Sequence, residues 1–399
     1  MSINLGEMIR RARLERGLTQ RQLAGTEMTR SFVSLVEANK AKPSLRNLMI
    51  ISQRLNKPIE FFLSEEADYR ESVRTFLSTS RHYLDLDDME KARTHAEQAA
   101  KISSLCSESV LQADAYLVLG KILMRMRELD PAFEYLEGAL DIYQQLNARE
   151  RVTETLLSMG NCCYLDENYH QALRYYQKSA LRSEHLKRQT QIFAQAMVYK
   201  GTTHYRLGEL AESAQAYEKA MIALQPLKQS KLLIDCILGL GWTCFKQGDT
   251  HRAIEITQRG IHLSEACDRH LYAELKHNLA IFQFHLSHYQ EAYALWNECL
   301  EMYIASNKVI KQASVKEDLA QYWLRFERYD TAKQLCEEGL SLLDITDSTV
   351  QRGRLFRLLS NIYSALGNPT MAAEIKRLAI ESFRRVRAKQ ELRETNIQC

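Results

Sequence analysis

The sequence predicts an all-α protein in which a small N-terminal domain of short helices precedes a long array of helix pairs. Three observations predict this class. Helix caps and turn residues divide residues 1–62 into short amphipathic segments. Positive charge is concentrated there, with eleven Lys and Arg against five Asp and Glu, whereas the whole chain is only +3. Beyond this segment, small residues return about every 40 positions, which indicates a helical repeat.

The overall composition narrows the class of protein. With 45% hydrophobic and 26% charged residues, the 399-residue chain has a globular composition. No apolar run approaches the roughly 20 residues of a membrane helix, and the N-terminus lacks the apolar segment of a signal peptide. We therefore expect a cytoplasmic protein whose nine cysteines, which include no C-x-x-C pair, are core residues.

Sequence motifs for catalysis or cofactor binding do not occur. The chain has no Gly-rich phosphate loop, H-E-x-x-H, G-x-S-x-G or kinase signature. His270, Glu274 and His277 share one face of a predicted helix and could in principle bind zinc. The sequence supplies no fourth ligand for them, so we interpret them as solvent-facing or ligand-contacting residues. We expect a protein that is not an enzyme and has no cofactor or metal.

The first two helices of the N-terminal domain are predicted from their ends. Ile9 and Arg13 share a face of a first helix that stops at Gly17, a natural C-cap. The stretch Thr19–Gln22 is a capping box that opens a second helix with Leu23 inside.

The third helix shows an uneven division of residues between its two faces. Thr29 caps this helix, and Phe32, Val33 and Val36 are predicted to point inward. Its outer face carries an arginine and serines, which can offer hydrogen bonds to base edges. Asn39 follows where the chain needs a left-handed residue, a conformation that asparagine tolerates.

A fourth helix is predicted to begin at Pro43-Ser44 and a short fifth helix at Pro58. Together these segments resemble the Cro/C1-type helix-turn-helix (the XRE family). The matching residues are Ile9, Arg10, Arg13, Gly17, Leu18, Thr19, Gln20, Leu23, Ala24, Val33, Ser34, Glu37, Pro43, Ser44 and Leu48. The sequence departs from the pattern in a turn that is one residue shorter, with Gly25 early, and in Asn39, which replaces the usual glycine.

The resemblance implies that the third helix lies in the major groove of DNA. The residues that it places at DNA are Thr29, Arg30, Ser31, Ser34, Leu35, Lys40 and Lys42. Arg30 is the predicted base reader, because arginine pairs bidentately with guanine, and Gln20 is predicted to hold phosphate. Arg13 and Glu37 are expected to form an internal ion pair. The plainer alternative is a small helical cap whose charges are only solvated.

The remainder of the chain repeats with a spacing of 39 to 41 residues over eight units. The first small residues are Ser80, Gly120, Gly160, Gly201, Gly241, Ala280, Ala320 and Ser360. Twelve residues later a second series follows: Ala92, Ala132, Ala172, Ser213, Ala253, Ala292, Ala332 and Ala372. Small residues at both points let two helices cross closely. The pattern is similar to tetratricopeptide repeats lengthened to about 40 residues, and it predicts a right-handed solenoid of eight helix pairs.

The first helices of such repeats line a concave groove. We refer to the polar and aromatic residues predicted to face it as the predicted ligand surface. They are Gln195, Tyr205, Arg206, Asp235, Trp242, Lys246, Glu274, His277, Asn278, Gln321 and Arg325. The alternative for each residue is that polar side chains are merely solvated and aromatic ones pack between helices.

The chain as a whole resembles the Gram-positive peptide-pheromone receptors (the RRNPP group). The resemblance implies a DNA-binding transcription regulator, a homodimer on an inverted-repeat operator, controlled by a short signalling peptide in the groove. We expect a helix-turn-helix domain at 1–64, a linker at 65–72, repeats at 73–385 and a tail at 386–399. The alternative is a repeat adaptor that docks a protein such as a response regulator, with DNA binding for placement.

Overall fold

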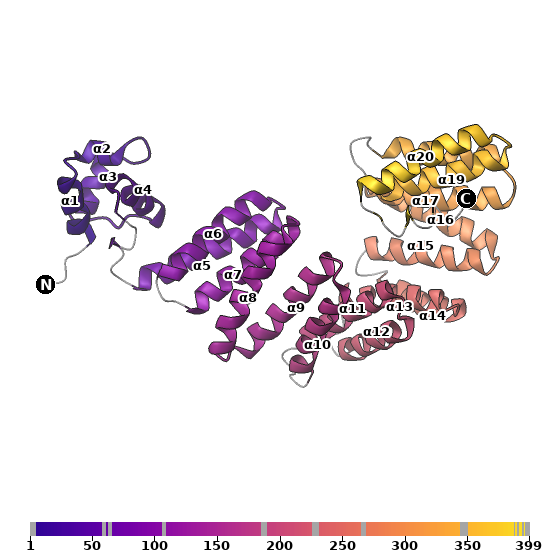
Figure 1. Cartoon of the computed structure of the whole chain (residues 1–399), viewed down its shortest axis with the longest axis horizontal. Coiled ribbons are helices and arrows are strands. Elements are labelled where there is room, and N and C mark those ends of the chain that lie inside the picture. The colour runs from indigo at the N-terminus through magenta and orange to yellow at the C-terminus, as the bar shows by residue number, and fades with distance from the viewer. Residues whose placement is uncertain are drawn as a thin grey trace. The chain divides into compact units, whose positions relative to one another are not determined.

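A computed structural model describes residues 5–57, 61–62, 66–105, 109–184, 190–225, 231–264, 269–343, 350–386, 388, 391–392 and 395. All regular structure in these ranges is helical, in twenty α-helices, which confirms the predicted all-α class (Figure 1). The chain divides into two compact units, residues 1–196 and 197–399. Each unit is described by itself.

The N-terminal domain contains four short helices in the described residues. They are α1 (Leu5–Glu15), α2 (Gln20–Ala24), α3 (Arg30–Glu37) and α4 (Leu45–Leu55). Their inward faces form one core from Ile9, Leu23, Val33, Val36, Leu48, Ile51 and Leu55, each at most 3% exposed. The predicted inward faces are therefore confirmed. The fifth helix, predicted to start at Pro58, falls at residues outside the described ranges.

The caps of these helices are the predicted ones. Thr19 and Gln22 form a reciprocal capping box, and the Thr29 hydroxyl accepts from the Phe32 N–H at 3.1 Å. Asn39 has a φ of 54°, as expected for the residue after α3. Its side-chain oxygen also accepts from the Gly6 N–H at 3.0 Å. A side chain at Gly6 would collide with the Val36 carbonyl oxygen, so glycine is what allows α1 and α3 to approach so closely.

The first unit continues with the repeat helices, in which neighbouring helices run antiparallel. They are α5 (Glu66–Asp85), α6 (Met89–Leu105), α7 (Ser109–Arg125), α8 (Leu129–Gln145), α9 (Arg149–Leu165) and α10 (Tyr169–Ser183). The boundary between the two units falls within α11 (Thr190–Leu207). Each helix from α5 to α9 packs against the next one along the chain.

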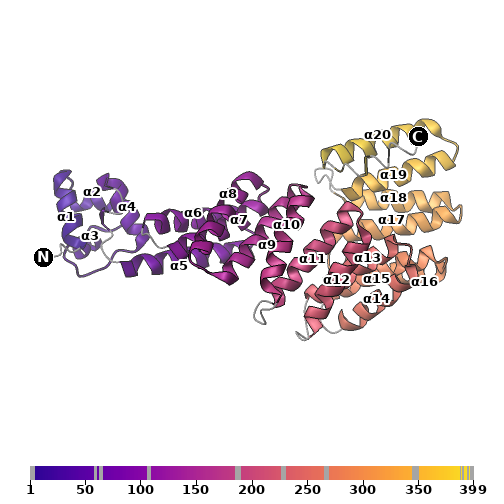
Figure 2. The ribbon, with the colours of Figure 1, turned by 60° about the horizontal axis from the view of Figure 1, so that its bottom comes forward.

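The second unit continues the same pattern. Its helices are α12 (Leu210–Leu224), α13 (Lys231–Lys246), α14 (Thr250–Ser264), α15 (Arg269–His285), α16 (Tyr289–Ala305), α17 (Val309–Arg325), α18 (Tyr329–Leu342), α19 (Val350–Ala365) and α20 (Pro369–Arg385). Consecutive helices from α12 to α20 pack against each other, as Figure 2 shows for α17 to α20. With α5 to α11, these helices form the eight predicted pairs, which we number one to eight from α5/α6 to α19/α20.

The two series of small residues mark the helix crossings, as predicted. Ala92, Ala132, Ala172, Ala253, Ala292 and Ala332 are all 0% exposed. Serine in either series adds a hydrogen bond across the pair. The Ser80 hydroxyl donates to the Ala92 carbonyl oxygen at 2.7 Å, and the Ser360 hydroxyl donates to that of Ala372 at 2.8 Å. The small residues therefore place the backbones of the paired helices in direct contact.

The segment expected to be a linker, 65–72, is largely helical. Helix α5 begins at Glu66, so residues 66–72 form its first two turns. The segment contains no glycine or proline to stop a helix, and Val73 and Leu77, which follow it on α5, are buried. Part of the expected tail also contacts the last repeat, because Glu391 pairs with Arg354 at 3.0 Å.

Six of the cysteines are described, and all are buried and reduced: Cys162, Cys163, Cys236, Cys244, Cys299 and Cys336. Burial is the main cause that raises the pKa of Cys162 to about 11 and the pKa values of Cys163, Cys236, Cys299 and Cys336 to about 12. These thiols therefore stay protonated near neutral pH.

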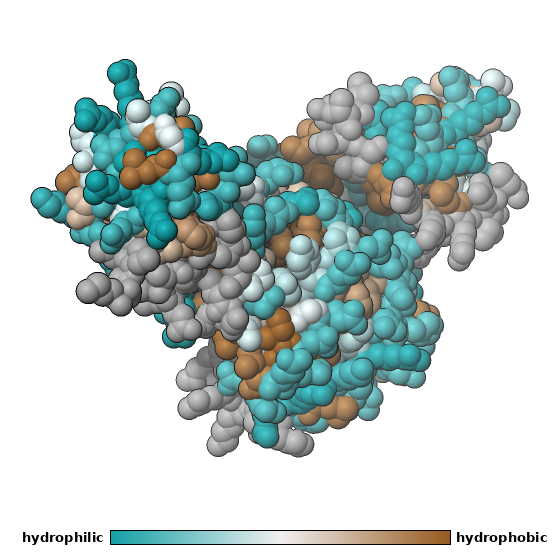
Figure 3. All heavy atoms as spheres, turned by 60° about the vertical axis from the view of Figure 1, so that its left-hand side comes forward, coloured by the Kyte–Doolittle hydropathy of each residue, from teal (hydrophilic) through white to brown (hydrophobic). Residues whose placement is uncertain are grey.

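The visible surface is mostly hydrophilic, with hydrophobic residues in small scattered groups (Figure 3). None of the described helices has both the length and the apolar character that crossing a bilayer would require.

Candidate functional sites

Helix α3 exposes the residues that the sequence assigned to DNA. Thr29, Arg30, Ser31 and Ser34 are exposed, and Leu35 is 45% exposed although it is apolar. The opposite face of α3 is fixed in the core, so the helix can present only this side. Lys40 and Lys42, which follow α3, are exposed as well. The result is a short helix with an arginine in its first turn and two lysines just beyond its end.

A buried ion pair holds α3 against α1. The Arg13 guanidinium donates to Glu37 Oε1 at 2.5 Å and to Oε2 at 3.0 Å, and also to the Leu18 carbonyl oxygen at 2.7 Å. Burial by itself would raise the pKa of Glu37, but hydrogen bonds from Arg13 and Gln20 outweigh it and hold that pKa below its usual value. The expected Arg13–Glu37 pair is therefore confirmed.

Gln20 has a partner that the sequence analysis missed. Its side-chain Nε2 donates to Glu37 Oε2 at 2.9 Å, which joins the start of α2 to the end of α3. The side chain is half-buried, and this bond fixes its orientation. No local signal in the sequence indicates the contact, because the two residues lie 17 positions apart. Its predicted phosphate contact stays a prediction.

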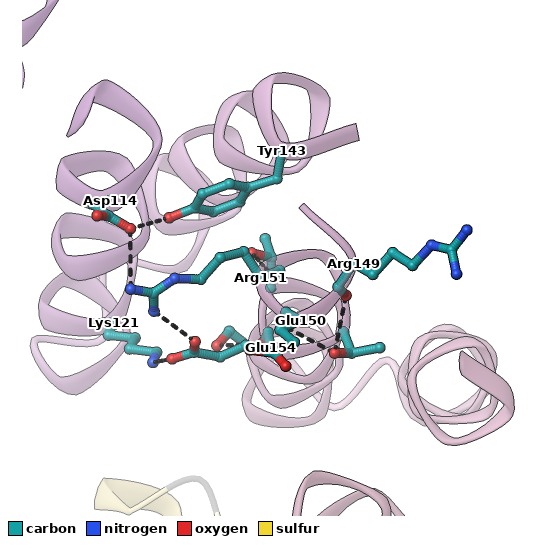
Figure 4. A network of polar contacts seen from close by, with 10 residues as sticks. Asp114, Lys121, Tyr143, Arg149, Glu150, Arg151 and Glu154 are labelled. Atoms are coloured by element: carbon teal, nitrogen blue, oxygen red, sulfur yellow. Dashed lines mark hydrogen bonds and ion pairs between the residues drawn. The ribbon is translucent and has the colours of Figure 1, made fainter. Parts of the chain in front are cut away.

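The second repeat and the third share a dense polar network (Figure 4). The Tyr143 hydroxyl donates to Asp114 Oδ1 at 2.5 Å. Arg151 lies between two acids, 3.5 Å from Asp114 and 3.0 Å from Glu154, and Lys121 contacts Glu154 at 2.6 Å. Burial and the neighbouring Asp114 carboxylate raise the pKa of Tyr143 well above its usual value. Asp114, Lys121, Arg151 and Glu154 therefore each have an opposite charge beside them.

The cations of the predicted ligand surface lie in the last turns of first helices. Arg206 is the residue before the last of α11, and Lys246 and Arg325 are the last residues of α13 and α17. All three are exposed. Tyr205 and Trp242 are half-buried beside them in the sequence. These ends of the helices can therefore offer both positive charge and aromatic surface.

Two acidic residues lie nearer the N-terminal ends of first helices, on α13 and α15. Asp235 on α13 is half-buried, and burial is the main cause that raises its pKa. Glu274 on α15 pairs with Lys311 at 2.5 Å and lies 3.9 Å from His270. The second unit therefore carries negative and positive charge toward opposite ends of its first helices.

Between these ends, buried hydrogen bonds join α15, α17 and α19. His277 Nε2 lies 2.6 Å from Asp318 Oδ2, and Gln351 donates to Glu317 Oε2 at 2.8 Å. Gln321 reaches the same carboxyl group at 3.4 Å. Burial, with the nearby Asp318 charge, raises the pKa of Glu317 to about 7. His277 is only 7% exposed, so it lies in this contact with Asp318 rather than on the solvent-facing surface.

The two remaining members of the predicted ligand surface are half-buried amides. Asn278 lies on α15 in the second unit, and Gln195 lies on α11 in the first unit, where it is described apart from the others. Across the described ranges, no three His, Cys, Asp or Glu side chains gather as a metal site would require.

Two protein-family models match parts of the chain. A helix-turn-helix family matches residues 9–62, and a tetratricopeptide-repeat family matches residues 111–180. These matches confirm the two kinds of domain predicted from the sequence. The chain is also 25% identical over 222 residues to "Response regulator aspartate phosphatase E" of Bacillus subtilis (strain 168). That match covers 55% of this chain and only 58% of the relative's length.

Solved structures share the fold at low sequence identity. The apo form of the quorum sensor NprR from B. thuringiensis gives a TM-score of 0.63 at 14% identity, over 94% of this chain and 99% of that one. Apo RapI gives 0.55 at 13% identity, over 68% and 97% of the two chains. Aspartyl phosphate phosphatase F from Bacillus subtilis gives 0.54 at 14%, over 87% and 95%. These likenesses show a shared helical-repeat fold, which agrees with the architecture predicted from the sequence.

Proposed function

We propose that this protein is a cytoplasmic transcription regulator that binds operator DNA as a homodimer and is controlled by a short signalling peptide. The observation that carries the proposal is the exposed face of α3, which presents Arg30, Ser31 and Ser34 on a helix-turn-helix joined to a repeat array. Support comes from the fold, which is similar to that of a quorum sensor.

DNA binding follows from charge and shape. Residues 1–62 carry a net charge of +6, which favours the phosphate backbone. Arg30 would read a guanine, and Gln20, held by Glu37, would fix the position of α2 on phosphate. One such domain contacts few base pairs, so two of them would read half-sites about 34 Å apart or a multiple of this.

The proposed peptide lies on the second unit. An extended chain covers about 3.3 Å per residue, so five to ten residues would cross several first helices. Asn278 and Gln321 would pair with its backbone, because an unpaired buried peptide group costs about 1–3 kcal/mol. Arg325 or Lys246 would meet a carboxylate, and Trp242 would give apolar surface.

The test begins with mass spectrometry of peptides that co-purify with the natively expressed protein. The identified peptide is then titrated by calorimetry into the wild type and into Asn278→Ala and Arg325→Ala variants. We expect weakened binding in both variants, with unchanged DNA affinity in the absence of peptide. Gln290→Ala, an exposed amide on α16, is the control and should bind as the wild type does. Wild-type affinity in both test variants would place the peptide elsewhere.

A second candidate function has one observation in its favour, the sequence match to a response regulator phosphatase. In this alternative, the repeats dock a response regulator, and the helix-turn-helix places the complex on DNA. Size-exclusion chromatography with a phosphorylated response regulator, followed over time for loss of phosphate, tests it. A stable complex without any peptide effect on DNA binding would favour the adaptor.

A further inference from the structure

The repeats allow one part of the chain to be compared with another at matching positions. One such position lies six residues before the first small residue of each repeat. In each unit, two consecutive repeats have an acidic residue at this position. These are Asp114 and Glu154 in repeats two and three, and Asp235 and Glu274 in repeats five and six. The surroundings of the two acid pairs differ, and the difference indicates a ligand.

In the first unit the protein supplies its own cation. The Arg151 guanidinium lies between Asp114 and Glu154, at 3.5 and 3.0 Å, as Figure 4 shows. Lys121 adds a second positive charge at Glu154, and Tyr143 donates to Asp114. The acid pair is therefore neutralised by side chains of the same chain.

In the second unit each of these partners is replaced. The position of Arg151, nine residues before the small residue, holds Leu271, which is 4% exposed. Trp242 stands in the place of Lys121. Ser264 stands in the place of Tyr143, and its hydroxyl donates to the Ile261 carbonyl oxygen at 3.1 Å. Within the described residues, the half-buried Asp235 carboxylate has no hydrogen bond or ion pair.

The other charged residues near Asp235 and Glu274 do not replace the cation that Arg151 supplies in the first unit. Lys311 binds Glu274 at 2.5 Å and so balances one of the two acids. Lys231, on the same helix as Asp235, lowers the pKa of Asp235 less than burial raises it. His270 lies 3.9 Å from Glu274. One negative charge is left over at Asp235.

A second polar group at this place is unsatisfied. Tyr303 has the same position within repeat six that Tyr143 has within repeat two. It is 1% exposed, and its hydroxyl has no hydrogen-bond partner in the described structure. The Glu274 charge acts on this hydroxyl, and the His277 ring lies 6.1 Å from the Tyr303 ring. Unsatisfied buried hydroxyls are uncommon in folded proteins, so the Tyr303 hydroxyl needs an explanation.

We propose that the position between Asp235 and Glu274 receives an arginine side chain of the ligand, in the way that Arg151 fills the matching position of the first unit. The inference rests on the proposed function, because it assigns one residue of the signalling peptide. A planar guanidinium can bond two carboxylates at once, and the exposed part of Trp242, two turns after Asp235 on α13, offers a ring face to it.

The test uses random hexapeptide libraries with arginine fixed in turn at each position, each paired with a library that has neutral citrulline there. Full-length protein is mixed with each pair, and the retained peptides are separated by size exclusion and counted by mass spectrometry. We expect arginine peptides to be retained about tenfold or more over their citrulline counterparts, as for hydrogen bonds to a charged group.

Two variants and one control locate the effect. Asp235→Asn should abolish the preference for arginine with little change in shape. Leu271→Arg, whose folding is checked by circular dichroism, should abolish it as well by supplying an internal guanidinium. Glu255→Gln removes the same charge from an exposed position on α14 and should keep the preference.

The outcomes separate this inference from the proposed function. Equal retention of arginine and citrulline peptides would overturn the arginine site and leave peptide binding intact. A preference that survives in Asp235→Asn would also overturn it, because the cation would then bind elsewhere. Retention of no peptide from any library would overturn the proposed peptide control together with the site.

Discussion

Replacement of Arg13 by leucine should destabilise the N-terminal domain strongly, whereas replacement of both members of the ion pair should not. The Arg13 and Glu37 side chains are 10% and 4% exposed. Arg13→Leu leaves the Glu37 carboxylate with the Gln20 amide and removes the donor to the Leu18 carbonyl oxygen. In Arg13→Leu/Glu37→Leu no buried charge is left.

The two variants should differ by several kcal/mol. Removal of one partner from a buried ion pair costs about 3–5 kcal/mol, whereas exchange of both partners for apolar residues is often close to neutral. A domain of about 60 residues has only about 3–9 kcal/mol of total stability, at about 0.05–0.15 kcal/mol per residue. Arg13→Leu therefore brings this domain close to unfolding.

Hydrogen exchange of the full chain, followed by mass spectrometry on peptides that cover α3, measures this directly. The single variant should lose protection in α3 by a factor on the order of 10²–10⁴, which corresponds to about 3–5 kcal/mol. Repeat helices such as α7 serve as an internal control and should exchange as in the wild type. A loss below about tenfold in the single variant, or an equal loss in the double variant, would refute the reasoning.

Three further predictions concern DNA reading, packing and acid stability. Arg30→Ala should lower the binding free energy at the specific operator by about 1–3 kcal/mol and relax discrimination at one base. Gln20→Ala should instead weaken binding to specific and non-specific DNA alike. Identical specificity profiles of the two variants on a set of operator variants would contradict this. Gly160→Ala places a methyl group 2.5 Å from Tyr176 Cε1 and should cost about 1–3 kcal/mol in denaturant unfolding, while an unchanged midpoint would show that the ring moves freely. The pKa of Glu37 is lower in the folded protein than in the unfolded chain, so its ionised form stabilises the folded domain. This stabilisation is complete above the unfolded pKa of about 4.3 and is lost as the pH falls through the folded pKa. Hydrogen-exchange protection of α3 that stays constant during acidification would contradict this.

The fold could be predicted from the sequence because its signals are local or periodic. Caps such as Thr19 and Thr29 act within three residues, and the small residues of each repeat return at a constant spacing. Gly6 could not be interpreted this way. The reason for a glycine there is the Val36 carbonyl oxygen, 30 positions away in the sequence.

The candidate sites were less predictable because polar partners come from different helices. The exposed face of α3 followed from its inward residues, but the Gln20–Glu37 contact did not. His277 was predicted as part of the ligand surface from its register alone, and the structure shows it buried against Asp318, 41 residues later. That separation is one residue more than the 40-residue period between these two repeats, so a search for complementary side chains about one period apart could have found the pair.

The buried cysteines give this protein a set of reporters that need no mutation. Cys162 and Cys163 lie in repeat three, Cys236 in repeat five, Cys299 in repeat six and Cys336 in repeat seven. Alkylation requires an exposed thiolate, so each thiol reacts only when its own repeat opens. Timed alkylation followed by peptide mapping would therefore follow opening repeat by repeat, and would show whether a bound ligand holds neighbouring repeats closed together.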